Sequence, residues 1–202
     1  MNDALHFMFS VGVALVTWMG VRTAASGVGV DAGLTPRLPI FLTSVIATWA
    51  THDRQGWAGA LLATVIAGVS ACAIGDLRTG YLFDRAIVLV SGLLISLADL
   101  SGNLGSAVIA GVIVTSPLLL LYAITGGRGL GLGDVKLAFP IGLGLGSVAG
   151  LGALGAAFIT GGLVGLVLLA RGYSRTSRIR FGPFLAFGTA TSALAPLLTV
   201  LR

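Results

Sequence analysis

The chain has 202 residues, of which 56% are hydrophobic and only 9% are charged. An ordinary soluble domain carries about 25% charged residues, so this composition excludes that class and indicates a membrane protein. The net charge of +5 is spread over short separate runs without a continuous basic stripe, and we therefore expect no nucleic-acid partner.

Eight uncharged stretches follow one another along the chain, and each is a candidate transmembrane helix. A helix needs about 20 mostly apolar residues to cross a bilayer, with a range of roughly 17–25. The sequence therefore predicts an all-α fold, a polytopic transmembrane helical bundle of about eight spans. The predicted spans are residues 4–21, 38–51, 57–75, 86–98, 104–125, 137–148, 151–170 and 184–201.

Local features refine these spans. The sixth and seventh spans come from one uncharged run, 137–170, which is too long for a single helix, so we expect a break near residues 146–150. Pro117 lies inside the fifth span and predicts a kink there. The 31 glycines, many of them inside spans, predict close helix packing.

Basic residues predict how the spans are oriented. Short loops rich in Lys and Arg remain cytoplasmic, and ten of the twelve basic residues fall on one side if the N-terminus lies outside. We therefore expect a multi-pass protein of the plasma (inner) membrane with both termini outside. The first span has no basic segment before it, which favours a retained helix over a cleaved signal peptide. The predicted inside loops are 22–37, 76–85, 126–136 and 171–183.

Two of the seven acidic residues are candidates for function. Asp76 follows the third predicted span and Asp134 opens the sixth, so the two intervening helices return both carboxylates to the same membrane face. A carboxylate near the membrane interior costs about 2.5–3.5 kcal/mol and by default marks a functional site. Gly131 and Gly133 lie beside Asp134 and allow the backbone to bend and to approach a substrate closely.

Two neighbouring carboxylates in a low dielectric cannot both ionise easily, so one of them keeps a proton. The ionised partner can take a proton from water, while the protonated one donates a hydrogen bond to a scissile carbonyl. This chemistry is that of an aspartic protease, which needs neither a metal nor another cofactor. The alternative is a pair of interfacial aspartates that are neutralised by Arg78 and Lys136.

Three motifs resemble one known family. Gly-Leu-Gly-Asp-Val-Lys at 131–136 matches the Gly-x-Gly-Asp motif of intramembrane aspartic proteases, and its Val-Lys end resembles the type IV prepilin peptidase family. Gly-Asp-Leu-Arg-Thr-Gly-Tyr-Leu-Phe-Asp at 75–84 is similar to that family's first aspartate segment. Arg-Phe-Gly-Pro-Phe-Leu-Ala at 180–186 resembles its Phe-Gly-Pro-Phe-Leu element.

The resemblance covers about residues 57–201 and implies a domain organisation and a site. It implies two N-terminal transmembrane helices with a short cytoplasmic loop in residues 1–56, and a six-helix catalytic core in residues 57–202. Asp76 and Asp134 match the catalytic pair, and Gly131, Gly133 and Lys136 support the second motif.

The implied function is that of a membrane aspartic endopeptidase. It would remove the leader peptide of type IV prepilin-like substrates at the cytoplasmic face, in contact with membrane lipid and without a cofactor. Two alternatives stay open, a small proton-coupled transporter and a catalytically inactive membrane protein of pilus assembly. The inactive alternative gains weight only if an altered turn after Asp76 displaces that residue.

The sequence departs from the family's pattern in two places. The Ile-Pro-Asp that typically follows the first aspartate segment is replaced by Leu82-Phe83-Asp84, and we expect Asp84 to cap the fourth span rather than take part in chemistry. Cys72 is the chain's one cysteine, so the paired Cys-x-x-Cys motifs of the bifunctional members are absent. The resemblance to the shorter members therefore implies a peptidase without N-methyltransferase activity.

Overall fold

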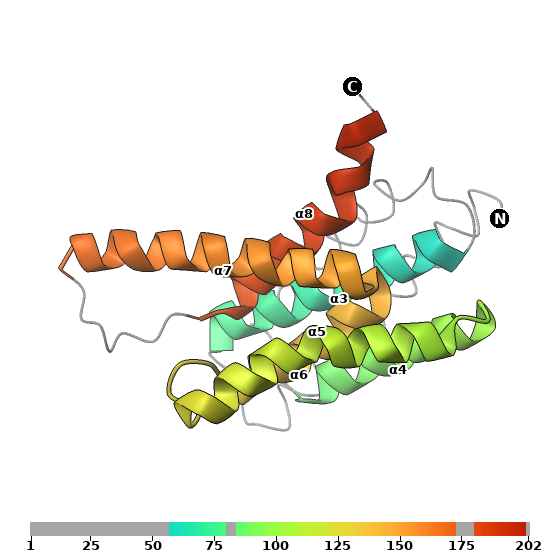
Figure 1. Ribbon diagram of the computed structural model, residues 1–202, viewed down its shortest axis with the longest axis horizontal. Coiled ribbons are helices and arrows are strands. Elements are labelled where there is room, and N and C mark those ends of the chain that lie inside the picture. The colour runs from blue at the N-terminus through green and yellow to red at the C-terminus, as the bar shows by residue number, and fades with distance from the viewer. Residues whose placement is uncertain (1–56, 80–83, 173–179, 201–202) are drawn as a thin grey trace.

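The computed structural model describes residues 57–79, 84–172 and 180–200. Within these ranges the chain folds into helices only, which confirms the all-α prediction there (Figure 1). The first two predicted spans fall in residues 1–56 and lie outside the described residues. The helices are α3 (Trp57–Thr79), α4 (Asp84–Leu100), α5 (Leu104–Thr125), α6 (Leu132–Leu145), α7 (Ser147–Ala170) and α8 (Gly182–Val200).

Three helical segments are long and apolar enough to cross a membrane, namely Ala58–Asp76 of α3, all of α5 and all of α7. This agrees with the membrane character expected from the composition. By contrast, α4 and α6 have 17 and 14 residues. At a rise of about 1.5 Å per residue, a helix as short as α6 does not cross a hydrocarbon core of about 30 Å. Helix length therefore does not support the predicted count of about eight spans.

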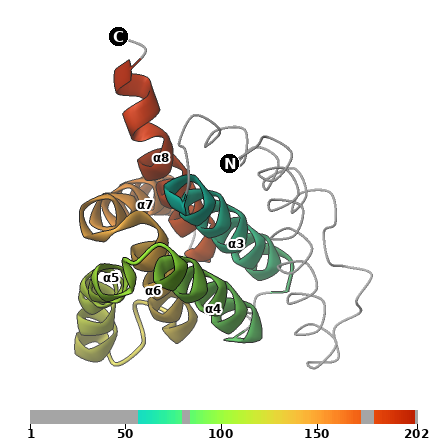
Figure 2. The same ribbon diagram turned by 90° about the vertical axis from the view of Figure 1, so that its right-hand side faces the viewer.

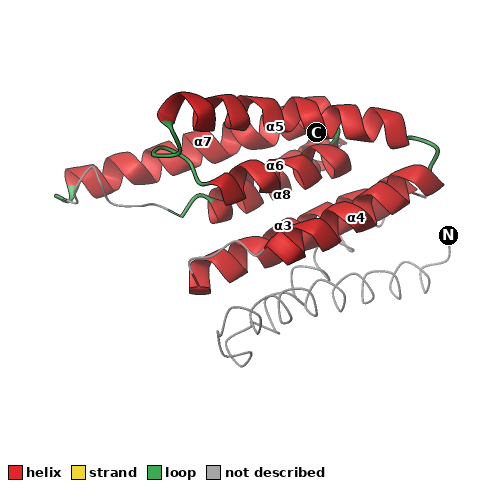
Figure 3. Ribbon diagram, turned by 90° about the horizontal axis from the view of Figure 1, so that it is seen from below, coloured by secondary structure: helices red, strands yellow, loops and turns green. Residues whose placement is uncertain are grey.

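The helix α3 is the most deeply buried of the three helices that could span a membrane. It packs against α4, α6 and α8, and Figures 2 and 3 show it side by side with α4. Of its most apolar segment 78% is buried inside the protein, compared with 28% for α5 and 22% for α7. The outer helices α5 and α7 thus expose most of their apolar side chains, as expected of helices whose solvent is lipid.

A single glycine separates α6 from α7. Gly146 has φ +81° and ψ 173°, and its N–H donates a 2.9 Å hydrogen bond to the carbonyl of Gly142. This backbone conformation is open essentially only to glycine. The structure confirms the predicted break in the uncharged run 137–170 and places it at the first residue of the expected interval.

Pro117 lies within α5, and the helix continues through it. A proline has no N–H, so the carbonyl of Ile113, four residues earlier, loses its usual donor. The hydroxyl of Ser116 donates to that carbonyl at 2.8 Å and thereby satisfies part of the lost hydrogen bonding. The predicted kink stays a prediction.

Glycines allow two of the helix pairs to approach closely. A Cβ atom placed on Gly142 of α6 would lie 2.5 Å from the carbonyl oxygen of Ala110 in α5. A Cβ atom on Gly188 of α8 would overlap the carbonyl oxygen of Ala153 in α7. Both contacts are backbone against backbone, which confirms the close packing predicted from the glycine content.

Candidate active site

The two candidate aspartates lie at the same end of the bundle. Asp76 is in the last turn of α3, which continues beyond the predicted span to Thr79, and Asp134 is in the first turn of α6. Their side chains are only 6% and 7% exposed, and the charge of Asp76 acts on the carboxyl group of Asp134. The fold therefore brings together the two residues that the sequence singles out.

Four polar or charged side chains are buried in the described part of the chain, and they fall into two groups. Thr64 and Thr189 donate their hydroxyl protons to the carbonyls four residues earlier in their own helices, at 2.8 and 2.7 Å. The other two are Asp76 and Asp134, and within the described ranges Oδ1 of Asp134 has no hydrogen-bond partner. Buried polar atoms normally have a partner, so this oxygen is available for a substrate or a water molecule.

The backbone of Gly131 shapes the surroundings of Asp134. The Gly131 carbonyl accepts the N–H of Asp134 at 3.1 Å and that of Val135 at 3.4 Å, which begins the helix α6. A Cβ atom on Gly131 would lie 3.1 Å from Oδ2 of Asp134, closer than a side chain is comfortably accommodated. Glycine at this position thus leaves room for the carboxylate, while Gly133 forms part of the same first turn and is half-buried.

Asp134 lies outside the three segments that can span a membrane. Burial and, to a smaller extent, the neighbouring charge of Asp76 raise the pKa of its carboxyl group from 3.8 to about 6, although a backbone hydrogen bond from Gly131 partly opposes them. An ordinary aspartic acid is ionised well below neutral pH. Asp134 instead keeps its proton over a range in which it can act as an acid.

Lys136 has a partner other than the two aspartates of the site. Its ammonium group donates to Oδ2 of Asp84 at 2.7 Å and so links the start of α6 to the start of α4. The alternative in which Lys136 neutralises Asp134 is therefore wrong. Asp84 is the first residue of α4, at the helix start where a cap was expected, and the side chain of Arg78 lies outside the described residues.

Sequence reasoning missed two residues near Asp76. A Cβ atom on Gly182, the first residue of α8, would lie 3.0 Å from Oδ2 of Asp76, and Figure 1 shows the end of α3 beside the start of α8. The positive charge of Arg180 also acts on Asp76. The sequence does contain a signal for both residues, since they belong to the motif at 180–186. The motif alone does not indicate which aspartate these residues approach.

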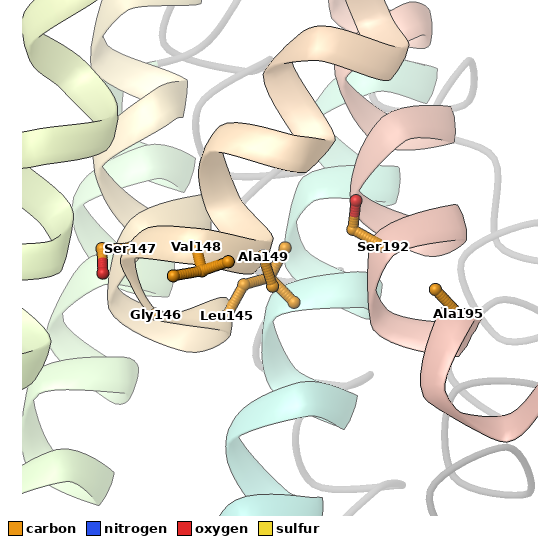
Figure 4. A pocket seen from close by; sticks show the side chains of 7 residues that line it. All are labelled: Leu145, Gly146, Ser147, Val148, Ala149, Ser192 and Ala195. Atoms are coloured by element: carbon orange, nitrogen blue, oxygen red, sulfur yellow. The ribbon is translucent and has the colours of Figure 1, made fainter. Parts of the chain in front are cut away.

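Figure 4 shows an open groove at the C-terminal end of α6, whereas Asp134 lies in the first turn of that helix. The groove has a volume of about 550 Å³, and it lies between the turn from α6 to α7 and the helix α8. It adjoins neither aspartate and is therefore not part of the candidate active site. The groove is lined by Leu145, Gly146, Ser147, Val148, Ala149, Ser192 and Ala195.

Comparison with known proteins identifies a family and two relatives. The sequence model of the Type IV leader peptidase family matches residues 63–166, about half of the chain, and this range includes both aspartates. Two curated relatives, each named prepilin leader peptidase/N-methyltransferase, come from strains 1026b and K96243 of Burkholderia pseudomallei. Each is 36% identical over 146 residues, which make up 68% of this chain and 47% of the relative.

The chain thus spans about half the length of the curated relatives that it matches. No solved structure matches it significantly. Because the family model matches about half of the chain, the chain belongs to the type IV leader peptidase family.

Proposed function

We propose that this protein is a membrane aspartic endopeptidase that removes the leader peptide from type IV prepilin-like substrates. The observation that carries the proposal is the burial of Asp76 and Asp134 together at one end of an otherwise apolar bundle. Family membership and the peptidase named among the relatives support the reaction type and the substrate class.

In the proposed reaction the two carboxyl groups share one proton. The ionised group takes a proton from a water molecule, whose oxygen attacks the scissile carbonyl carbon, and the protonated group hydrogen-bonds the carbonyl oxygen. Oδ1 of Asp134, buried and without a partner in the described residues, is a suitable donor for that hydrogen bond once protonated. The position of Asp76 beside Gly182 argues against the inactive alternative, which required a displaced Asp76.

We infer that the site faces the cytoplasm. The loops 76–85, 126–136 and 171–183 adjoin the end of α3, the start of α6 and the start of α8, and these loops are rich in Arg and Lys. Basic loops of this kind stay inside. The N- and C-termini would then lie outside the plasma membrane, with two further spans in residues 1–56 preceding a catalytic core in residues 57–202.

We also propose how a substrate reaches the site. Prepilin-like substrates carry a short basic leader followed by an apolar helix, and such a helix fits the bilayer beside the core. Lipid-facing side chains on α5 and α7 provide apolar surroundings for it, while its cleavage site reaches the polar end of the bundle. The substrate would thus be positioned by the membrane as much as by contacts with the enzyme.

The absence of N-methyltransferase activity remains part of the proposal. The relatives' name includes that activity, but this chain has one cysteine, buried as Cys72 in α3, and no Cys-x-x-Cys motif. We expect the purified protein to transfer no methyl group from S-adenosylmethionine to a processed pilin. Incorporation of labelled methyl groups above that of a control without the enzyme would contradict this.

The direct test is coexpression with a candidate prepilin and detection of leader removal on a gel. Asp76→Asn and Asp134→Asn are each expected to reduce cleavage by at least about 100-fold while membrane insertion remains normal. Asp99→Asn, an exposed aspartate near the end of α4, is the matched control and should cleave like the wild type. Retained cleavage in either of the first two variants would refute the assignment of the pair.

A further inference from the structure

The start of α8 lies against the carboxyl group of Asp76. Gly182, the first residue of this helix, is buried, and a Cβ atom there would lie 3.0 Å from Oδ2 of Asp76. The carbonyl of the preceding residue, Phe181, accepts hydrogen bonds from the N–H groups of Phe184 and Leu185 at 3.0 and 3.2 Å. Phe181 thus closes the first turn of α8, so the position of Phe181 also determines where Gly182 lies.

The ring of Phe181 contacts two other aromatic rings. Its centroid lies 5.0 Å from that of Phe158, in the middle of α7, and 6.2 Å from that of Phe184 in α8. The rings are tilted by 44° and 43°, and both distances lie in the range that aromatic pairs prefer. These three residues form a phenylalanine cluster, which joins the middle of α7 to the start of α8.

Gly161 of α7 leaves space for the phenylalanine cluster. A Cβ atom on Gly161 would lie 3.2 Å from Cε2 of Phe181 and 3.5 Å from Cδ2 of Phe184. A larger side chain at this position would therefore have to displace the ring of Phe181. The next residue, Gly162, differs, because a Cβ atom on it would meet no other described residue within 4 Å. Of these two adjacent positions, only the first reaches the cluster.

The helices α7 and α8 are also joined away from the phenylalanine cluster. Further along α8, a Cβ atom on Gly188 would overlap the carbonyl oxygen of Ala153 in α7, so the two backbones are in contact there. Loss of the Phe181 ring should therefore release the start of α8 without separating the two helices.

We propose that Phe181 is a positioning residue, whose ring in the phenylalanine cluster holds Gly182 against the carboxyl group of Asp76. This role rests on the proposed peptidase function. The backbone of Gly182 limits the positions open to Oδ2 of Asp76, and a shift of about 1 Å in a reacting group can lower a rate by on the order of 100-fold. The helix α7, which carries neither aspartate, thus contributes to the site through α8.

The first test measures leader removal by the purified full chain in bilayer nanodiscs, with a prepilin-like protein as substrate. Phe181→Ala is expected to lower kcat about tenfold with little change in KM, and Phe181→Tyr, which keeps the ring, should retain most of the activity. Phe187→Ala is the matched control, because it removes an exposed ring from the same helix. Equal losses in Phe181→Ala and Phe187→Ala would contradict the proposal.

The glycine pair in α7 tests the same contact from the other side. Gly161→Val should lower kcat to about the level of Phe181→Ala, since its side chain would displace the ring of Phe181. Gly162→Val adds the same side chain one residue later and should cleave like the wild type. Equal kcat values in the two valine variants would count against a role for the cluster.

A double-mutant cycle separates positioning from a general loss of structure. Gly182→Ala should lower kcat, and it should do so less in a Phe181→Ala background, where the released start of α8 can accommodate the added methyl group. Gly155→Ala provides the control cycle, since a Cβ atom there would meet nothing within 4 Å in the part of the chain that the structure describes. Multiplicative effects in both cycles would overturn the proposal.

Disulfide formation tests the contact without any substrate. A Cβ atom on Gly182 would lie 3.5 Å from Cβ of Asp76, and disulfides join Cβ atoms roughly 3.5–4.5 Å apart. Asp76→Cys/Gly182→Cys, made together with Cys72→Ala to remove the native thiol, should cross-link α3 to α8 on mild oxidation with copper phenanthroline. Addition of Phe181→Ala should slow the cross-linking several-fold, whereas addition of Phe187→Ala should not.

The two assays distinguish this proposal from the proposed function. Equal cross-linking rates with and without the Phe181 ring would refute the positioning role, even if the wild type removes leaders. If the wild type removes no leader but cross-linking depends on Phe181, the peptidase proposal fails while the anchoring of α8 by the phenylalanine cluster stands.

Discussion

The two ends of α6 both carry a glycine, but for different physical reasons. At the polar end Gly131 has φ −74° and ψ 144°, an ordinary extended conformation, and its missing side chain leaves room for Oδ2 of Asp134. At the apolar end Gly146 has φ +81° and ψ 173°, and a Cβ atom there would meet nothing within 4 Å. The first glycine is needed for space and the second for backbone conformation, so substitutions at the two ends should affect different properties.

The largest expected effect is on catalysis at the polar end. Gly131→Val is compatible with the extended backbone, so its free energy of unfolding should stay near that of the wild type. Its side chain would displace the Asp134 carboxylate, and a shift of about 1 Å can reduce a rate by on the order of 100-fold. Leader removal and thermal unfolding measured on the same preparation would check both parts, with Gly155→Val as the control.

Asp134 should also make stability depend on pH. Its pKa is raised from 3.8 to about 6, so the folded protein holds this proton more tightly than the unfolded chain does. Stability should therefore decrease as pH rises from about 4 to about 6, by at most about 3 kcal/mol. The melting temperature should decrease less across this pH range in Asp134→Asn than in the wild type. An equal decrease in both proteins would contradict the role of Asp134.

The opposite outcome is expected at the apolar end. Gly146→Ala forces a side chain into a conformation that costs roughly 1–3 kcal/mol, so the melting temperature should fall. The rate of leader removal by the folded protein should stay within about twofold of the wild type. A large loss of activity without loss of stability would mean that the glycines at the two ends of α6 do not serve different purposes.

The smallest effect concerns the ion pair between Lys136 and Asp84. Their side chains are 42% and 64% exposed, and such pairs contribute about 0–1 kcal/mol. Lys136→Met and Asp84→Asn should therefore each lower stability by less than about 1 kcal/mol, and the double variant should lose less than the sum. Additive losses in this double-mutant cycle would show that the pair is not coupled.

Apolar run length and charge are sufficient to predict where most of the helices lie. The helix α5 has the predicted bounds of 104–125, and the break between α6 and α7 falls where glycines interrupt the uncharged run. Hydropathy places the start of the sixth span after Lys136, whereas α6 begins at Leu132. This difference arises because a helix can continue through charged residues that a hydrocarbon core would exclude.

Spacing along the chain also predicted that Asp76 and Asp134 lie together, since two intervening helices return the chain to the same face. It did not predict the partner of Lys136 or the contact of Gly182 with Asp76. Those contacts depend on which helices pack side by side, and apolar patterns are nearly uniform around helices in lipid. Where every face of a helix is hydrophobic, periodicity carries little information about its neighbours.

The burial of α3 also bears on how the protein responds to its membrane. When bilayer thickness differs from the length of a span, helices in contact with lipid tilt or deform to match it. The lipid-exposed helices α5 and α7 would take up that mismatch first, whereas α3 is largely enclosed by protein. Of these three helices, α3 should therefore respond least to hydrophobic mismatch, and we expect the position of Asp76, which it carries, to depend little on lipid composition.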